Sequence, residues 1–140
     1  DKKTTIEDTY EYNAKNLLVK INTTVNNVLG GYRNFKYNSK DQETAWISYD
    51  ANGVQFQKRT TEYTGDNYVV KNYNSADQLD DQTAYEVVDG KIMKKTFYRK
   101  DVEQYVQTYS YDASGNMIRD EYKSSIHSVS VIKEWAYACD

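Results

Sequence analysis

The chain has 140 residues, with 18 Lys and Arg against 21 Asp and Glu and a formal net charge of −3. This length suits one domain with a core, and the lack of a net positive charge argues against a nucleic-acid partner. No apolar run is long enough to span a membrane, and a single cysteine excludes an intramolecular disulfide scaffold.

Tyrosine takes the place of much of the usual aliphatic content. Leu, Ile, Val and Phe are scarce, whereas 15 residues are Tyr and none is Pro. Tyr, Thr and Val favour pleated sheet over helix. The Tyr-, Asn- and Thr-rich composition favours an exported protein. No apolar segment stands near Asp1, so we expect that the signal peptide of the exported protein has been removed.

Alternating segments separated by turn residues predict an all-β fold. Taken in chain order, the predicted strands are 4–12, 17–23, 32–37, 43–49, 54–63, 68–73, 82–88, 91–98, 102–111, 116–123 and 128–137. Helical spacing of Val25, Val28 and Leu29 before Gly30-Gly31 predicts a short irregular or helical insertion near 24–31. We therefore expect a single domain over 1–140. It is an antiparallel meander of about ten or eleven strands, either a strongly twisted open sheet or a partly closed barrel.

Two nearly identical sequences mark hairpin turns, Tyr49-Asp50-Ala51-Asn52-Gly53 and Tyr111-Asp112-Ala113-Ser114-Gly115. Asp at the first turn position accepts hydrogen bonds from the backbone ahead of it, and Gly at the last position supplies positive φ. The pattern predicts a type I turn with a G1 bulge at both sites. Tyr12-Asn13-Ala14-Lys15-Asn16 and Tyr73-Asn74-Ser75-Ala76-Asp77 are looser copies of the same motif.

Two further turns have other signatures. Asp89-Gly90 predicts a two-residue type I′ turn that places Val88 opposite Lys91, and Gly65-Asp66 fits a type II′ turn. A two-residue loop fixes the strand register, because a slip by one residue would turn every side chain to the other face.

The two Tyr-Asp motifs resemble the tyrosine-aspartate (YD or RHS) repeats of bacterial cell-surface proteins. The chain is also similar in style to small exported domains of unknown function from gut Bacteroides. The resemblance implies hairpins in an extended β-sheet and an exported location, and it implies no catalytic residues because these families share none.

Aromatic side chains on the predicted strands are the strongest candidates for a binding surface. We expect most of them to pack across strands, with a minority exposed on one sheet face. Trp46, Tyr109 and Trp135 are the first choices as binding residues, because Trp and Tyr are the side chains that most often anchor a partner.

Catalytic and metal-binding signals are weak. His127 is the one histidine and has no Gly-flanked serine elbow, and Cys139 has no partner thiol. Asp77, Asp80 and Asp81 lack the spacing of a calcium loop. We therefore expect no metal, no cofactor and no enzymatic activity. The predicted function is a non-enzymatic exported or cell-surface domain that binds a protein or glycan or is structural. The alternatives are a small-ligand carrier with a barrel interior and, less favoured, a hydrolase that uses His127.

Overall fold

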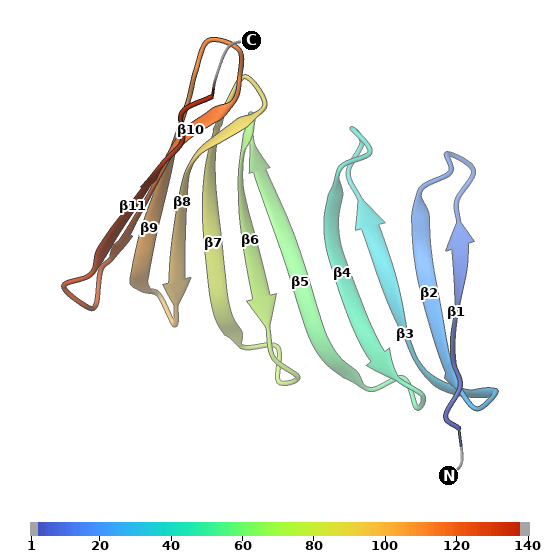
Figure 1. Ribbon diagram of the computed structural model, residues 1–140. Helices are drawn as coiled ribbons and strands as arrows, with labels where there is room; N and C mark the ends of the chain where they lie inside the picture. Colours follow the sequence, from blue (N-terminus) through green and yellow to red (C-terminus); the bar gives the residue numbers. More distant parts are fainter. Residues whose placement is uncertain (1–2, 138–140) are drawn as a thin grey trace. The chain divides into compact units, whose positions relative to one another are not determined.

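The computed structural model describes residues 3–137, which form eleven β-strands and no helix (Figure 1). The strands are β1 (Ile6–Tyr12), β2 (Leu18–Val25), β3 (Val28–Tyr37), β4 (Glu43–Asp50), β5 (Gln55–Thr64), β6 (Asn67–Tyr73), β7 (Leu79–Val88), β8 (Lys91–Arg99), β9 (Val102–Tyr111), β10 (Met117–Ser124) and β11 (Ser130–Glu134). Each strand is hydrogen-bonded to its neighbours in chain order. The predicted antiparallel meander is confirmed. The order has β1 and β11 at its ends, without the pairing of first and last strand that closes a barrel.

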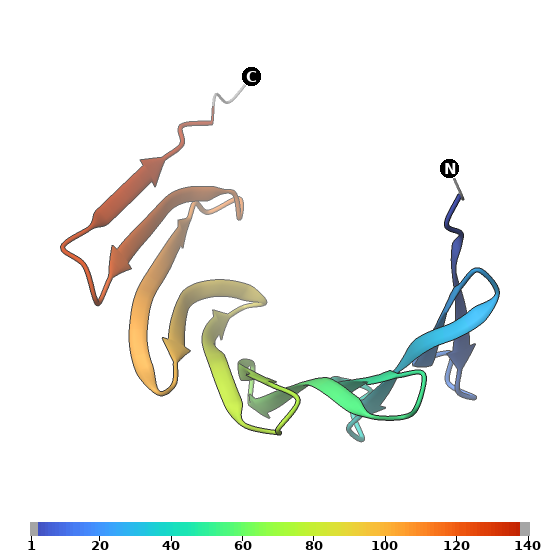
Figure 2. The same cartoon turned by 90° about the horizontal axis from the view of Figure 1, so that it is seen from below.

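The chain forms two compact units. The first comprises the residues up to Thr61 together with Asn72–Leu79, and the second comprises Glu62–Lys71 together with the residues from Asp80 onward. In the second unit β9 bends along its length (Figure 2). No helix within the described part of the chain is long and apolar enough to cross a membrane.

The four predicted Tyr-Asx turns are present, and they share one geometry with a fifth turn at Asn38. In each, an Asn or Asp accepts backbone hydrogen bonds at its side-chain oxygen, and the residue three positions later has φ between 59° and 89°. The first residues of these turns are Asn13, Asn38, Asp50, Asn74 and Asp112, and the left-handed residues are Asn16, Asp41, Gly53, Asp77 and Gly115. The two Tyr-Asp turns are equivalent, since the N–H of the Asp bonds the carbonyl four residues on, at 2.9 Å in both. Bonds from the side chain and the backbone N–H of Asn116 lower the pKa of Asp112.

The two-residue turns also match their predicted types. Asp89 and Gly90 both have positive φ, 50° and 74°, and Val88 lies opposite Lys91. Gly65 has a φ of 64°, as the first position of a type II′ turn requires.

The predicted helical insertion near 24–31 is wrong. Residues 22–25 end β2, and Asn26 and Asn27 form a tight turn with φ of 51° and 63°, after which β3 begins at Val28. Asn tolerates the left-handed region, so an Asn-Asn pair makes the type I′ hairpin that Asn-Gly makes elsewhere. The apolar residues at helical spacing instead belong to two paired strands, with Val25 opposite Val28.

Few side chains are fully buried, and most strand residues are half-buried. The side chains on each face of the sheet cover one another only in part. Among the described residues Val70 is the buried hydrophobic, at 5% exposure, and Ser48, Thr83 and Thr96 are buried polar residues. Aromatic rings form cross-strand rows: Tyr63–Tyr68–Tyr85 and Phe97–Tyr105–Tyr122 in the second unit, and Tyr32–Tyr49 in the first. Such pairs add stability beyond the area they bury.

Candidate functional site

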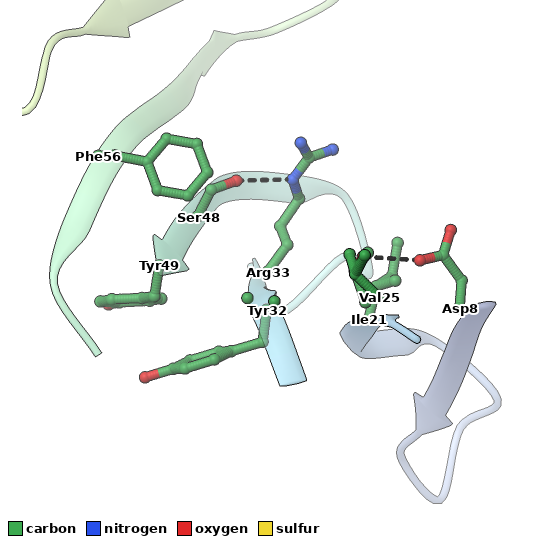
Figure 3. A pocket seen from close by; sticks show the side chains of 11 residues that line it. Asp8, Ile21, Val25, Tyr32, Arg33, Ser48, Tyr49 and Phe56 are labelled. Carbon is green, nitrogen blue, oxygen red and sulfur yellow. Dashed lines mark hydrogen bonds between the residues drawn. The ribbon is translucent and has the colours of Figure 1, made fainter. Parts of the chain in front are cut away.

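A hollow of about 360 Å³ lies within the first unit, on strands β1 to β5 (Figure 3). Its lining consists of Asp8, Ile21, Thr23, Val25, Gly30, Gly31, Tyr32, Arg33, Ser48, Tyr49 and Phe56. A volume of this size falls at the lower end of the range of small-ligand pockets.

Two β-bulges shape this hollow. In the pairing of β2 with β3, Gly30 is an extra residue between Leu29 and Gly31. In the pairing of β4 with β5, Phe56 is an extra residue between Gln55 and Gln57. Both extra residues line the hollow. A bulge bends a strand and redirects its side chains. Here both bulges lie at the hollow.

Gly31 lines the hollow at a point where the backbone of the next strand comes close. It is buried and lies opposite Asp50, and a Cβ atom built on it would lie 2.6 Å from the carbonyl oxygen of Tyr49. No side chain fits there without displacing backbone. Since side chains alternate along a strand, the face that carries Arg33 carries nothing at position 31.

Arg33 is the main charged group of the hollow. Its Nε donates a hydrogen bond of 2.9 Å to Ser48 Oγ, and its guanidinium carbon lies 4.3 Å from the centre of the Trp46 ring. Ser48 is 3% exposed, so this anchor is shielded from water. Figure 3 shows the two terminal nitrogens of Arg33 pointing away from Ser48. A guanidinium held by stacking and one hydrogen bond is pre-oriented for a planar anion such as a carboxylate.

Acidic groups also act near this arginine. Burial raises the pKa of the Glu43 carboxyl, and the positive charges of Arg59 and Arg33 oppose that rise. At the opposite rim Asp8 accepts a 2.6 Å hydrogen bond from Thr23 Oγ1. The hollow therefore offers cationic donors on one side and a carboxylate acceptor on the other, a combination that suits a ligand with both an acid and hydroxyl groups.

The three predicted binding residues are divided between the two units. Trp46 belongs to the first unit, where Arg33 covers its ring, and it supports the hollow from beside it. Tyr109 and Trp135 belong to the second unit, on β9 and just after β11, with β10 between these strands. Tyr109 is half-buried, and burial raises its pKa, whereas Trp135 is 41% exposed.

His127 lies in the turn between β10 and β11 and is exposed. Its backbone N–H bonds Ser124 Oγ at 3.1 Å, and its carbonyl accepts a bond from Val129. Cys139 lies outside the described residues. Within residues 3–137, no group of three or more His, Cys, Asp or Glu is placed to hold a metal ion. Asp77, one of the loop aspartates, instead pairs with Lys58 at 2.6 Å.

Sequence reasoning missed Arg33, Ser48 and Gly31. The one available signal was the Gly30-Gly31 pair, which we attributed to a helix stop. Within a predicted strand, such a pair indicates a bulge or a close backbone approach, and the structure shows both.

No protein-family model matches the chain, and no characterised protein matches its sequence significantly. Among solved structures, the chain is similar to a protein of unknown function from Bacteroides fragilis NCTC 9343, with 8% sequence identity and a TM-score of 0.43 over 96% of this chain and 93% of that chain.

Proposed function

We propose that this chain is a non-enzymatic, exported or cell-surface binding domain, and that the hollow of the first unit takes an acidic glycan. The observation that carries the proposal is the guanidinium of Arg33, fixed on Trp46 and Ser48 with its terminal nitrogens free of that anchor. A sugar carboxylate would accept two parallel hydrogen bonds from it. The Tyr-Asp turn motifs agree with a cell-surface role.

A glycan suits the dimensions better than a protein does. The hollow has room for one or two sugar rings, whereas a standard protein interface covers about 800 Å² on each partner. Asp8 at the rim would accept a sugar hydroxyl, and Phe56 offers an exposed apolar edge. The barrel-type carrier loses its basis, because the strand order of the described residues has no closing pair.

The test is a glycan array followed by calorimetry with an acidic hit and its neutral reduced analogue. We expect Arg33→Gln to weaken binding of the acidic sugar by about tenfold to a hundredfold, the range expected for loss of a charge-assisted bond of about 1.5–3 kcal/mol. Arg99→Gln removes the same charge from an exposed position and serves as the matched control.

Three results would contradict the proposal of an acidic glycan. Equal binding of the acidic and neutral sugars would remove the role of Arg33. Loss of binding in His127→Ala together with unchanged binding in Arg33→Gln would support the hydrolase alternative instead. A protein captured in an Arg33-dependent way, with no hit on the array, would keep the hollow as a site but replace the glycan with a protein carboxylate.

A further inference from the structure

A separate hollow, of about 250 Å³, lies in the second unit on β9, β10 and β11, three strands that run side by side (Figure 2). It is lined by Gln107, Asp120, Tyr122, Val131 and Lys133. Pockets for drug-sized ligands have volumes of about 300–1,000 Å³, so this hollow suits a ligand with one small ring.

The strand register brings these five residues together. Tyr122 on β10 lies opposite Gln107 on β9 and opposite Val131 on β11. Asp120, two residues before Tyr122, lies opposite Lys133. Residues that face each other across strands share a face of the sheet, as do residues two apart on one strand. The lining therefore forms two adjacent cross-strand rows on one face.

A carboxylate and an amide hold each other within the hollow. The side-chain nitrogen Nε2 of Gln107 donates a hydrogen bond of 2.7 Å to Asp120 Oδ1. An ionised carboxylate only accepts hydrogen bonds, so the amide must turn its NH₂ group to Asp120 and its oxygen elsewhere. Among the described residues, no donor bonds Asp120 Oδ2 or Gln107 Oε1. The pair thus offers two acceptors in a fixed arrangement.

Lys133 supplies donors at the edge strand. It is exposed and lies opposite Asp120, yet the ion pairs of the described residues do not include it. Water and salt screen the charge of an exposed ammonium, so its electrostatic attraction for a ligand is small. Its three N–H groups remain hydrogen-bond donors. Acceptors and donors therefore line the same small space.

An aromatic ring completes the lining. Tyr122 packs against Tyr105 with ring centroids 5.1 Å apart, and it also lines the hollow. Val131 beside it is 44% exposed. A tyrosine ring combines an apolar face with a polar tip, which suits a ligand that has both C–H and hydroxyl groups. Tyr109, one of the predicted binding residues, lies opposite Asp120 and so borders the hollow on β9.

We propose that this hollow binds one neutral sugar ring. Its hydroxyls would donate to Asp120 and Gln107 and accept from Lys133, since a hydroxyl does both, and its C–H groups would pack on Tyr122. The charges of Asp120 and Lys133 balance, so an anion would meet the carboxylate and a cation would meet the ammonium. The inference does not depend on the acidic ligand proposed for the first unit, because the two hollows share no residue.

The test is an NMR titration of the isotope-labelled full chain with the methyl glycosides of glucose, galactose and mannose. We expect at least one of them to bind with a dissociation constant of about 1–10 mM, the range for a single small ring, and to shift backbone amide signals of β9 to β11. The absence of such shifts up to about 50 mM of all three glycosides would overturn the proposal.

Variants on β10 and β11 test the named contacts. Asp120→Asn should weaken binding at least about tenfold, and Lys133→Met, which keeps the apolar stem, about three- to tenfold. Glu121→Gln and Lys123→Met are the matched controls, because these neighbours on β10 point to the opposite face and should leave binding unchanged. Equal weakening by the controls would contradict the site. Melting temperatures verify folding, and exposed Lys133 keeps the test valid if Asp120→Asn unfolds the chain.

Two further titrations separate this site from the alternatives. The zwitterion alanine, which matches both charges but has no hydroxyl, should cause no shift at the same concentration. Alanine binding in place of the glycosides would replace the sugar with an amino acid and overturn the proposal. Arg33→Gln should leave glycoside binding unchanged, whereas Asp120→Asn should leave binding of an acidic sugar unchanged. Loss of glycoside binding in Arg33→Gln would place the neutral sugar in the other hollow and refute this assignment.

Discussion

Replacing Gly31 with Ala is the sharpest perturbation of the first unit. The added Cβ would lie 2.6 Å from the carbonyl oxygen of Tyr49, whereas C···O contacts between strands are about 3.3 Å or longer. The obstacle is backbone in the paired strand, so β3 and β4 must separate by several tenths of an ångström where Gly31 faces Asp50. Overpacking of this kind costs about 1–3 kcal/mol.

Urea unfolding of a Trp135→Phe background measures this cost, because Trp46 is then the sole tryptophan and reports on the first unit. The free energy of unfolding should fall by about 1–3 kcal/mol, or the melting temperature by about 4 °C for each kcal/mol. Gly30→Ala is the matched control. Its Cβ would lie 3.3 Å from Val25 Cγ2, a side-chain atom that can turn away, so the expected cost is under about 1 kcal/mol.

The reasoning fails if Gly31→Ala costs no more than Gly30→Ala. That result would mean that the two strands have enough freedom at this point to take a methyl group, and that the absent side chain is not what opens the hollow. If Gly31→Ala loses stability but still binds the glycan, the steric argument holds and the proposed site does not depend on the absence of a side chain at position 31.

The remaining predictions concern the turns and the tyrosine hydroxyls. Gly115→Val should cost at least about 1 kcal/mol in the same assay, because its φ of 89° is strained for a β-branched residue. Tyr37→Phe should cost about 1 kcal/mol through its lost hydrogen bond, whereas Tyr12→Phe, at an exposed residue, should leave the stability unchanged. The bonds from Asn116 lower the pKa of Asp112, so the stability they give is present above pH about 4 and is lost as pH falls through the lowered value. Asp112→Asn should therefore narrow the difference between neutral and acid stability, as measured by melting temperature against pH.

Most of the hairpins could be predicted from the sequence because their information is local. Asp89-Gly90 permits one turn type, which fixes the pairing of Val88 with Lys91, and the structure has that pairing. The Asn38 turn was predicted only as a gap between strands. Its sequence Tyr37-Asn38-Ser39-Lys40-Asp41 fits the Tyr-Asx pattern once Asp is allowed at the left-handed position.

The hollow could not be predicted because it depends on pairs of strands. Whether Gly30 and Phe56 are extra residues is decided by their neighbours' registers, and no local pattern encodes a register shift. Likewise, Trp46 was selected as an exposed anchor, but the cross-strand position of Arg33 over its ring decides its role. The sequence identifies the aromatic residues, whereas their exposure depends on which charged side chain comes to lie across from them.

The abundance of tyrosine follows from how this sheet covers itself. A phenol ring buries area against its cross-strand neighbour, as in the Tyr68–Tyr85 stack at 4.5 Å, while its hydroxyl still reaches water or a carbonyl. Half-buried tyrosine rings can therefore stabilise the sheet, whereas a row of leucines at the same positions would leave an exposed apolar patch that promotes aggregation. In the first unit, the ring pair Tyr32–Tyr49 covers one face beside Gly31, and the other face has a gap at that residue. At Gly31 the backbone of β4 is too close for any side chain. Arg33 lies on the same face, held by its hydrogen bond to Ser48 and its contact with the Trp46 ring. The close backbone approach at Gly31 therefore lies beside the site that we propose.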